Sequence, residues 1–217
     1  MSHGGGATPL FVEYFPLPVP VRAPSSTMTT RFTLLACAVS LVVFVGGCGS
    51  DEPRSAFEPA DFRRALAGAP APLARLYAEP EGLVGGGRDA FRRRLVDLRG
   101  HPVVVNKWAS WCGPCRHEFP FFQQQVVKRG KKVAFLAVNS EDAREPAEKF
   151  LGEIPVPYPS YLDPDSDIAE VLGLARNFPT TTFYDRGGER VYTKPGGYAS
   201  EAALADDVRE YAVEGAR

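Results

Sequence analysis

Apolar positions along the chain gather into two runs typical of buried strands, and each run is followed by a stretch with helical spacing. The first run, Val103 to Val105, leads to Trp108 and is typical of a buried central strand. The second run covers residues 132–140. Helical patterns follow at 113–128 and 141–151, so strands and helices alternate. This alternation predicts right-handed crossovers and a largely parallel α/β core.

Weaker patterns precede this core. Short helical stretches are predicted at 58–66 and 72–78, where nearby prolines keep each stretch short. An amphipathic helix is predicted at 88–98. Gly100 then ends that helix and Pro102 opens the strand.

The segment after the core continues the pattern and ends in a helix that Ser200 caps. The elements predicted before that helix are an extended piece at 158–162, a helix at 168–174, a strand at 180–185, a hairpin turn at 185–188 and a return strand at 189–194. The inner stripe of the last helix is predicted to comprise Ala203, Leu204, Val208 and Tyr211.

The N-terminal residues differ in composition from the rest. Residues 1–27 are rich in Pro, Gly and Ser, and Met28 is the better start. An apolar run at 32–45 is about as long as the core of a signal peptide and shorter than the roughly 20 residues of a spanning helix. It ends in Gly46-Gly47-Cys48, which resembles a bacterial lipobox and implies cleavage before Cys48 and lipid attachment to its sulfur. An uncleaved anchor helix, or an ordinary signal peptide, is the alternative.

These observations predict five segments. They are an N-terminal extension that is disordered or not native (1–27), a lipoprotein-type signal peptide (28–47), a tether (48–57), an N-terminal helical segment (58–84) and an α/β domain (85–217).

Composition narrows the function classes. A net charge of −1 does not indicate the excess of positive charge that nucleic-acid-binding proteins typically carry. The four cysteines, at 37, 48, 112 and 115, exclude a zinc ribbon because no second close pair follows. They also exclude a disulfide-dense secreted scaffold. If the signal peptide is cleaved and Cys48 is acylated, Cys112 and Cys115 are the one free pair.

The pair Cys112-Gly113-Pro114-Cys115 lies where the first predicted strand gives way to a helix. A helix N-terminus favours an anion, and the thiolate is the nucleophilic form of cysteine. Cys112 is therefore the expected attacking thiolate, and Cys115, one turn later, the resolving thiol. Pro114 costs little at an early helical position, whereas Pro120 lies deeper in the helix.

Residues 100–120, with both tryptophans and the trailing Glu118-Phe119-Pro120, resemble the TlpA/ResA-like family of extracytoplasmic, membrane-anchored thioredoxins. The resemblance implies a thioredoxin fold, in which a central mixed sheet is flanked by helices and carries the central insertion of that branch. One departure is Lys107, where the branch often has Phe, and we expect its head to reach the sheet edge or solvent.

The resemblance also implies the roles of several residues. It implies an acid–base role for Glu118 and a cis-proline at Pro179 that faces the dithiol. An exposed helix acid is the alternative for Glu118, and a trans strand-start proline is the alternative for Pro179. Substrate contacts are expected from Trp111, Gly113, Pro114, Phe178 and Thr180, with Trp108 in the core.

The predicted function is a thiol–disulfide oxidoreductase that reduces extracytoplasmic protein disulfides, with cytochrome c maturation as one setting. The partners expected are disulfide- or thiol-bearing proteins, a membrane thiol electron donor and the membrane itself through lipid on Cys48. The protein is expected to be located on the outer face of the bacterial membrane and to act there as a monomer. It needs no cofactor or metal besides its redox-active disulfide, Cys112–Cys115.

Three other functions share this fold. A dithiol oxidase has the same residues and the opposite redox direction. A thiol peroxidase needs Thr/Ser-x-x-Cys, and Ala109 occupies the hydroxyl position before Cys112. A copper chaperone needs C-x-x-x-C and a distant histidine, and no histidine follows His117.

Overall fold

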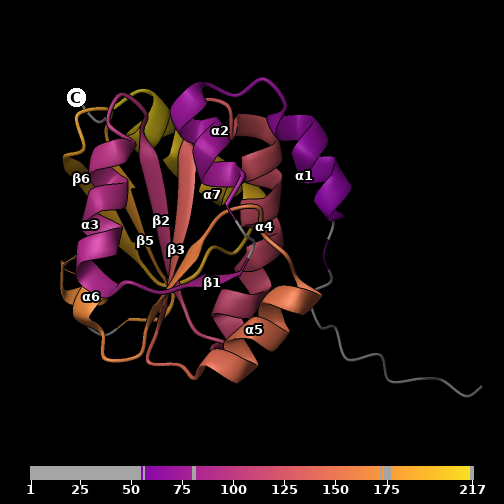
Figure 1. Cartoon of the computed structure of the whole chain (residues 1–217), viewed down its shortest axis with the longest axis vertical. Coiled ribbons are helices and arrows are strands. Elements are labelled where there is room, and N and C mark those ends of the chain that lie inside the picture. Colours follow the sequence, from indigo (N-terminus) through magenta and orange to yellow (C-terminus); the bar gives the residue numbers. More distant parts are fainter. Residues whose placement is uncertain (1–54, 56, 80–81, 172, 174–176, 216–217) are drawn as a thin grey trace, which may run out of the picture. The chain divides into compact units, whose positions relative to one another are not determined.

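A mixed sheet of six strands lies at the centre of the part of the chain that the structure describes, in the order β1-β4-β3-β2-β5-β6 (Figure 1). The first four strands of this order run parallel, β5 pairs antiparallel with β2, and β6 pairs antiparallel with β5. The strands are β1 (Leu83–Val84), β2 (Val103–Trp108), β3 (Ala134–Ser140), β4 (Ser160–Asp163), β5 (Thr180–Tyr184) and β6 (Arg190–Pro195). The predicted α/β class and thioredoxin fold are confirmed.

Figure 1 presents a computed structural model that describes residues 55, 57–79, 82–171, 173 and 177–215. These all belong to one unit, Gly49–Arg217. The predicted extension, the signal peptide and Cys48 lie outside the described residues. Within the described ranges, no helix combines the length and apolar character needed to cross a membrane.

Helices cover both faces of the sheet. One hydrophobic cluster, under α1, α4, α5 and the C-terminal helix, includes Val104 and Trp108. The other, under α2, α3 and α6, includes Val103 and Val105. Successive residues of β2 thus enter opposite cores, and every residue of the strand is buried. The helices are α1 (Pro59–Leu66), α2 (Ala71–Tyr77), α3 (Gly87–Asp97), α4 (Gly113–Arg129), α5 (Arg144–Glu153), α6 (Asp167–Val171), α7 (Glu201–Asp207) and the π-helix η1 (Val208–Val213).

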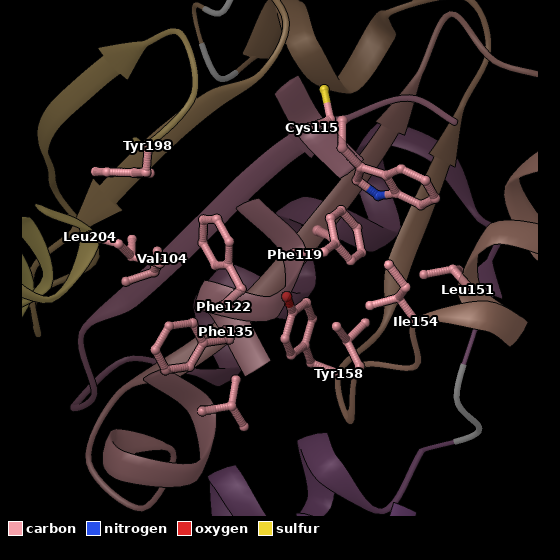
Figure 2. Close-up of a cluster of buried hydrophobic side chains, with 14 of the residues drawn as sticks. Val104, Cys115, Phe119, Phe122, Phe135, Leu151, Ile154, Tyr158, Tyr198 and Leu204 are labelled. Carbon is pink, nitrogen blue, oxygen red and sulfur yellow. The ribbon is translucent and has the colours of Figure 1, made fainter. Parts of the chain in front are cut away.

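The core on the α4 face is rich in aromatic rings (Figure 2). Trp108 of β2 meets Phe119 of α4 edge to face, with ring centroids 4.9 Å apart. Phe119 in turn meets Phe150 of α5 at 4.8 Å. Burial of one such side chain stabilises the fold by about 1.5–3 kcal/mol. The same core contains Cys115, so the start of α4 is anchored by packing.

Two details differ from the sequence prediction. The segment at 58–84 contains a strand as well as helices, because β1 pairs in parallel with β4 through only two residues, too few to leave a periodic pattern. The last helix continues as η1, and its inner stripe is Leu204, Val208 and Ala212, with the predicted Tyr211 partly buried against the same cluster. Ala203 is exposed, which makes its predicted inward position wrong.

Candidate active site

Cys112 and Cys115 form a disulfide at the start of α4, with an S–S distance of 1.96 Å. Cys112 is the N-cap residue, and its Sγ accepts a hydrogen bond from the Cys115 backbone N–H at 3.1 Å. The sulfur therefore takes the place that a capping oxygen takes in other helices. The same N–H and the dipole of a 17-residue helix would stabilise a thiolate on Cys112.

The two sulfurs differ in access. Cys115 is fully buried, and Cys112 is 4% exposed. Gly113 and Pro114, which lie between them in sequence, are both exposed. An incoming group therefore reaches the Cys112 side of the disulfide first.

Glu118 lies one turn after Cys115 on α4, and its side chain is fully buried. Its Oε1 accepts a hydrogen bond from Asn106 Nδ2 at 2.6 Å, and its Oε2 accepts one from the Tyr198 backbone N–H at 3.0 Å. Burial raises the pKa of this carboxyl to about 7, although these two hydrogen bonds and the nearby charge of Lys194 oppose the rise. The structure thus rules out the exposed-acid alternative for Glu118.

The residues that hold Glu118 come from distant parts of the chain. Asn106 is on β2, and Tyr198 follows the loop after β6. The Lys194 ammonium donates to the Gly196 and Gly197 carbonyls and lies over the Tyr198 ring at 4.5 Å. The sequence offered no signal for Tyr198, because a backbone N–H donor has no side-chain signature.

The peptide bond between Phe178 and Pro179 is cis, as the resemblance implied. Pro179 is buried, and its carbonyl accepts a hydrogen bond from the Gly196 N–H at 2.9 Å. A methyl group placed on Gly197 would lie 3.4–3.6 Å from Pro114 Cβ, Pro179 Cγ and Glu118 Oε2. The cis-proline, the Cys-Gly-Pro-Cys turn and the buried acid therefore surround one glycine, although they are far apart in sequence.

Trp111 and Phe178 form an aromatic wall beside the disulfide. Trp111 is 58% exposed, and its ring centroid lies 4.8 Å from that of Phe178. The indole Nε1–H donates to the Glu141 carbonyl at 2.9 Å. Glu141 has a positive φ of 51°, so the loop after β3 adopts a left-handed turn where it meets the indole.

Lys107 does not reach solvent, which makes the predicted position of its head wrong. The residue is fully buried, and its Nζ lies 3.9 Å from the centroid of the Phe178 ring. Burial lowers the pKa of this lysine, and the carboxylates of Glu141 and Asp163 oppose that shift. The physical reason is that β2 is a central strand covered on both faces, so position 107 has no path to an edge.

Asp142 is a further residue near the site that the sequence prediction missed. Its carboxylate accepts hydrogen bonds from the Ser110 N–H at 2.5 Å and from the Ser110 hydroxyl at 2.9 Å. It also accepts one from Asn139 Nδ2 at 2.8 Å. These bonds fix the loop that enters Cys112, and an acid in a loop gives no recognisable pattern in the sequence.

Thr180, the other predicted substrate contact, is almost fully buried. Its hydroxyl donates to the Asn177 carbonyl at 2.8 Å, and its backbone pairs with Lys107 at the start of β5. The structure thus brings Cys112, Cys115, Glu118, Pro179 and the remaining predicted contacts to one end of the sheet.

The family model described as Redoxin matches residues 69–204. The thiol:disulfide interchange protein HelX of Rhodobacter capsulatus is 33% identical over 153 residues, which cover 70% of this chain and 80% of that protein. The thiol-disulfide oxidoreductase ResA of Geobacillus thermodenitrificans is 31% identical over 97 residues, which cover 44% of this chain. That match spans about half of the ResA protein, 55% of its length. A crystal structure of a DsbF homologue from Corynebacterium diphtheriae, 27% identical, superposes with a TM-score of 0.49 over 52% of this chain and 74% of that chain.

Proposed function

Because this chain belongs to the Redoxin family, we propose that it is a thiol–disulfide oxidoreductase that reduces protein disulfides through Cys112 and Cys115. The single observation that carries the proposal is the disulfide at the N-terminus of α4, with a buried Glu118 behind it and Pro179 beside it. The names of the relatives HelX and ResA support the same chemistry.

The reaction starts from the reduced dithiol. The Cys112 thiolate attacks one sulfur of the substrate disulfide, a mixed disulfide forms, and the first substrate thiolate leaves and takes a proton. Cys115 then loses its proton and attacks Cys112 Sγ, which breaks the mixed disulfide and releases the second thiolate. The substrate gains two electrons and two protons, and the protein ends in the disulfide state seen here. The slight exposure of Cys112 and the full burial of Cys115 support this order.

Glu118 is suited to handle the proton of Cys115. Residues three apart on a helix lie on the same face, with Cβ atoms about 5–6 Å apart, so Glu118 and Cys115 are neighbours on α4. A pKa of about 7 lets the group both accept and release a proton near neutral pH. The hydrogen bonds from Asn106 and Tyr198 hold the two oxygens in place during the transfer.

The substrate segment binds between the aromatic wall and the cis-proline loop. The Phe178 backbone, next to Pro179, offers extended hydrogen-bonding groups to a peptide, and Trp111 offers an exposed apolar surface. Gly113 and Pro114 leave room above the disulfide because neither carries a long side chain. Thr180 supports this loop from beneath through its bond to Asn177.

The proposed setting follows from the N-terminal sequence and the family resemblance. Cleavage before Cys48 and its acylation would tether the domain, as a monomer, to the outer face of the bacterial membrane. A membrane dithiol donor would then return Cys112 and Cys115 to the reduced state. Proteins whose cysteine pairs must be reduced during cytochrome c maturation are one substrate class that fits this setting.

The test is the reduction of insulin disulfides by the purified domain, residues 49–217, with dithiothreitol as the electron source. We expect turbidity from the released B chain to develop faster than with dithiothreitol alone, and Cys112→Ser/Cys115→Ser to remove the difference. A protein that accelerates the oxidative refolding of reduced ribonuclease more than the reduction of insulin would be an oxidase, which would overturn the reductase proposal.

A further inference from the structure

The lysine beneath the aromatic wall is the feature that the proposed chemistry does not explain. Lys107 is a fully buried cation on a central strand, next in sequence to Trp108. Burial of a charge is costly unless other groups compensate for it. The burial of Lys107 therefore calls for a structural explanation, which the residues around it provide.

The surroundings of Lys107 connect both halves of the aromatic wall. Its Nζ lies over the face of the Phe178 ring at 3.9 Å, which is within the range of a cation–π interaction. Its charge is also attracted by the carboxylates of Glu141 and Asp163. The backbone carbonyl of Glu141 accepts the hydrogen bond from the Trp111 indole. The side-chain carboxylate of Glu141 accepts one from the Ser166 hydroxyl at 3.1 Å.

One of the two anions, Asp163, is held in place by hydrogen bonds. Asp163 is buried and accepts hydrogen bonds from the Ser140 hydroxyl and from the N–H groups of Ile168 and Ala169 at the start of α6. The cation thus contacts the Phe178 ring while the charge of a buried, hydrogen-bonded carboxylate attracts it. The Lys107 ammonium can therefore hold the Phe178 ring at a defined position.

We propose that Lys107 is a positioning residue that holds Phe178 and, through Glu141, Trp111, so that the aromatic wall is formed before a protein substrate binds. This inference rests on the proposed function and deepens it, because it assigns the wall to peptide segments around a substrate disulfide. A small disulfide does not span the wall, so its reaction at Cys112 is independent of Lys107.

The experiment compares Lys107→Met, which has a similar length and no charge, with Lys107→Arg, which keeps the charge. Lys132→Met, at an exposed position before β3, is the matched control for the loss of one positive charge. Each variant is assayed with insulin and with hydroxyethyl disulfide.

For Lys107→Met we expect the KM for insulin to rise about fivefold to tenfold, with kcat within about twofold of the wild type. The rate with hydroxyethyl disulfide should stay unchanged, and Lys107→Arg and Lys132→Met should resemble the wild type. Equal losses on both substrates, or an unchanged KM for insulin, would overturn the inference. A KM for Lys107→Arg as high as that for Lys107→Met would also overturn it, because the positive charge would then not be the cause.

A spectroscopic readout separates this inference from the proposed function, since it needs no turnover. The indole ¹H–¹⁵N signal of Trp111, assigned by its absence in Trp111→Phe, should shift and exchange faster in Lys107→Met. An unchanged signal contradicts the positioning role, even if insulin reduction fails for another reason. Failure of the wild type to reduce insulin, with a shifted signal in Lys107→Met, would instead count against the reductase proposal alone.

Phe178→Leu provides two more measurements. In a double-mutant cycle, the KM effects of Lys107→Met and Phe178→Leu should not add, because both remove the same contact. If Lys107→Met does not fold, the ammonium ¹H–¹⁵N signal of Lys107, assigned by its absence in Lys107→Arg, should move in Phe178→Leu. Additive effects, or an ammonium signal that does not move, would contradict the contact on which the inference depends.

Discussion

Two buried ionisable side chains lie on opposite faces of β2 at the same end of the sheet. Asn106 points toward α4 and donates to Glu118, whereas Lys107, the next residue, contacts Phe178. Burial drives the pKa of the acid up to about 7 and the pKa of the base down, so each charged form is disfavoured. The two groups therefore face the same physical penalty on two sides of one strand.

The surroundings of the two groups differ in a way that matches the proposed roles. Glu118 accepts two hydrogen bonds and follows the dithiol on α4, which suits a group that exchanges a proton. Lys107 meets an aromatic face and is attracted by two carboxylates, which suits a charge that stays in place. One strand thus supplies Asn106 to the acid–base group and Lys107 to the aromatic wall.

The largest expected effect comes from removal of the two sulfurs that carry out the exchange reaction. Cys112→Ser should lower insulin reduction about a thousandfold or more, because the nucleophile is lost. Cys115→Ser should accumulate mixed disulfides with substrate proteins, visible on non-reducing gels, because the resolving thiol is absent. If Cys112→Ser trapped partners better than Cys115→Ser, the two sulfurs would have the opposite roles.

Removal of the acid should have the next largest effect. Glu118→Gln should slow insulin reduction by about a hundredfold near pH 7, since a general acid–base group is lost. The rate of insulin reduction by Glu118→Gln should also depend less on pH near pH 7 than that of the wild type. Rapid-quench measurement of mixed-disulfide resolution checks this, and an unchanged resolution rate would restrict Glu118 to a structural role.

The raised pKa of Glu118 also predicts how stability depends on pH. The folded state binds this proton up to about pH 7, and the unfolded chain releases it near 4.5, so stability falls as pH rises between these values. In the oxidised protein, urea unfolding should show a loss of about 2–3 kcal/mol from pH 5 to pH 8. Glu118→Gln should lack this contribution, and equal pH slopes for both proteins would contradict the buried, titrating acid.

The smallest expected effect has the opposite sign and comes from Lys107. Its pKa in the folded state lies below the ordinary value of 10.5, so the unfolded chain binds more protons as pH rises toward that value. Relative to Lys107→Met, the wild type should therefore gain stability with rising alkaline pH. Urea unfolding of both proteins across this range checks the sign, and a relative loss would contradict the lowered pKa.

Much of this arrangement was predictable because it is encoded locally. The run from Val103 to Trp108 predicted the central strand, and Cys112-Gly113-Pro114-Cys115 predicted the dithiol at a helix N-terminus. The cis geometry at Pro179 followed from the family resemblance. The roles assigned to Glu118, Phe178 and Thr180 stay predictions until the variants are measured.

The features that were missed depend on tertiary contacts. Lys107 has a charged side chain that favours solvent, and only the covering of both sheet faces buries it. Tyr198 acts through its backbone N–H, and β1 is only two residues long. None of these leaves a periodic pattern or a motif in the sequence.

The reduction potential of the Cys112–Cys115 pair tests the proposed function most directly. It can be measured by equilibration of the purified domain, residues 49–217, in glutathione redox buffers, with the dithiol and disulfide forms separated after alkylation. A value at or below about −200 mV, in the range of glutaredoxins and thioredoxin, is the predicted result. A value near about −120 mV, typical of a strong oxidant, would contradict a role in reducing protein disulfides.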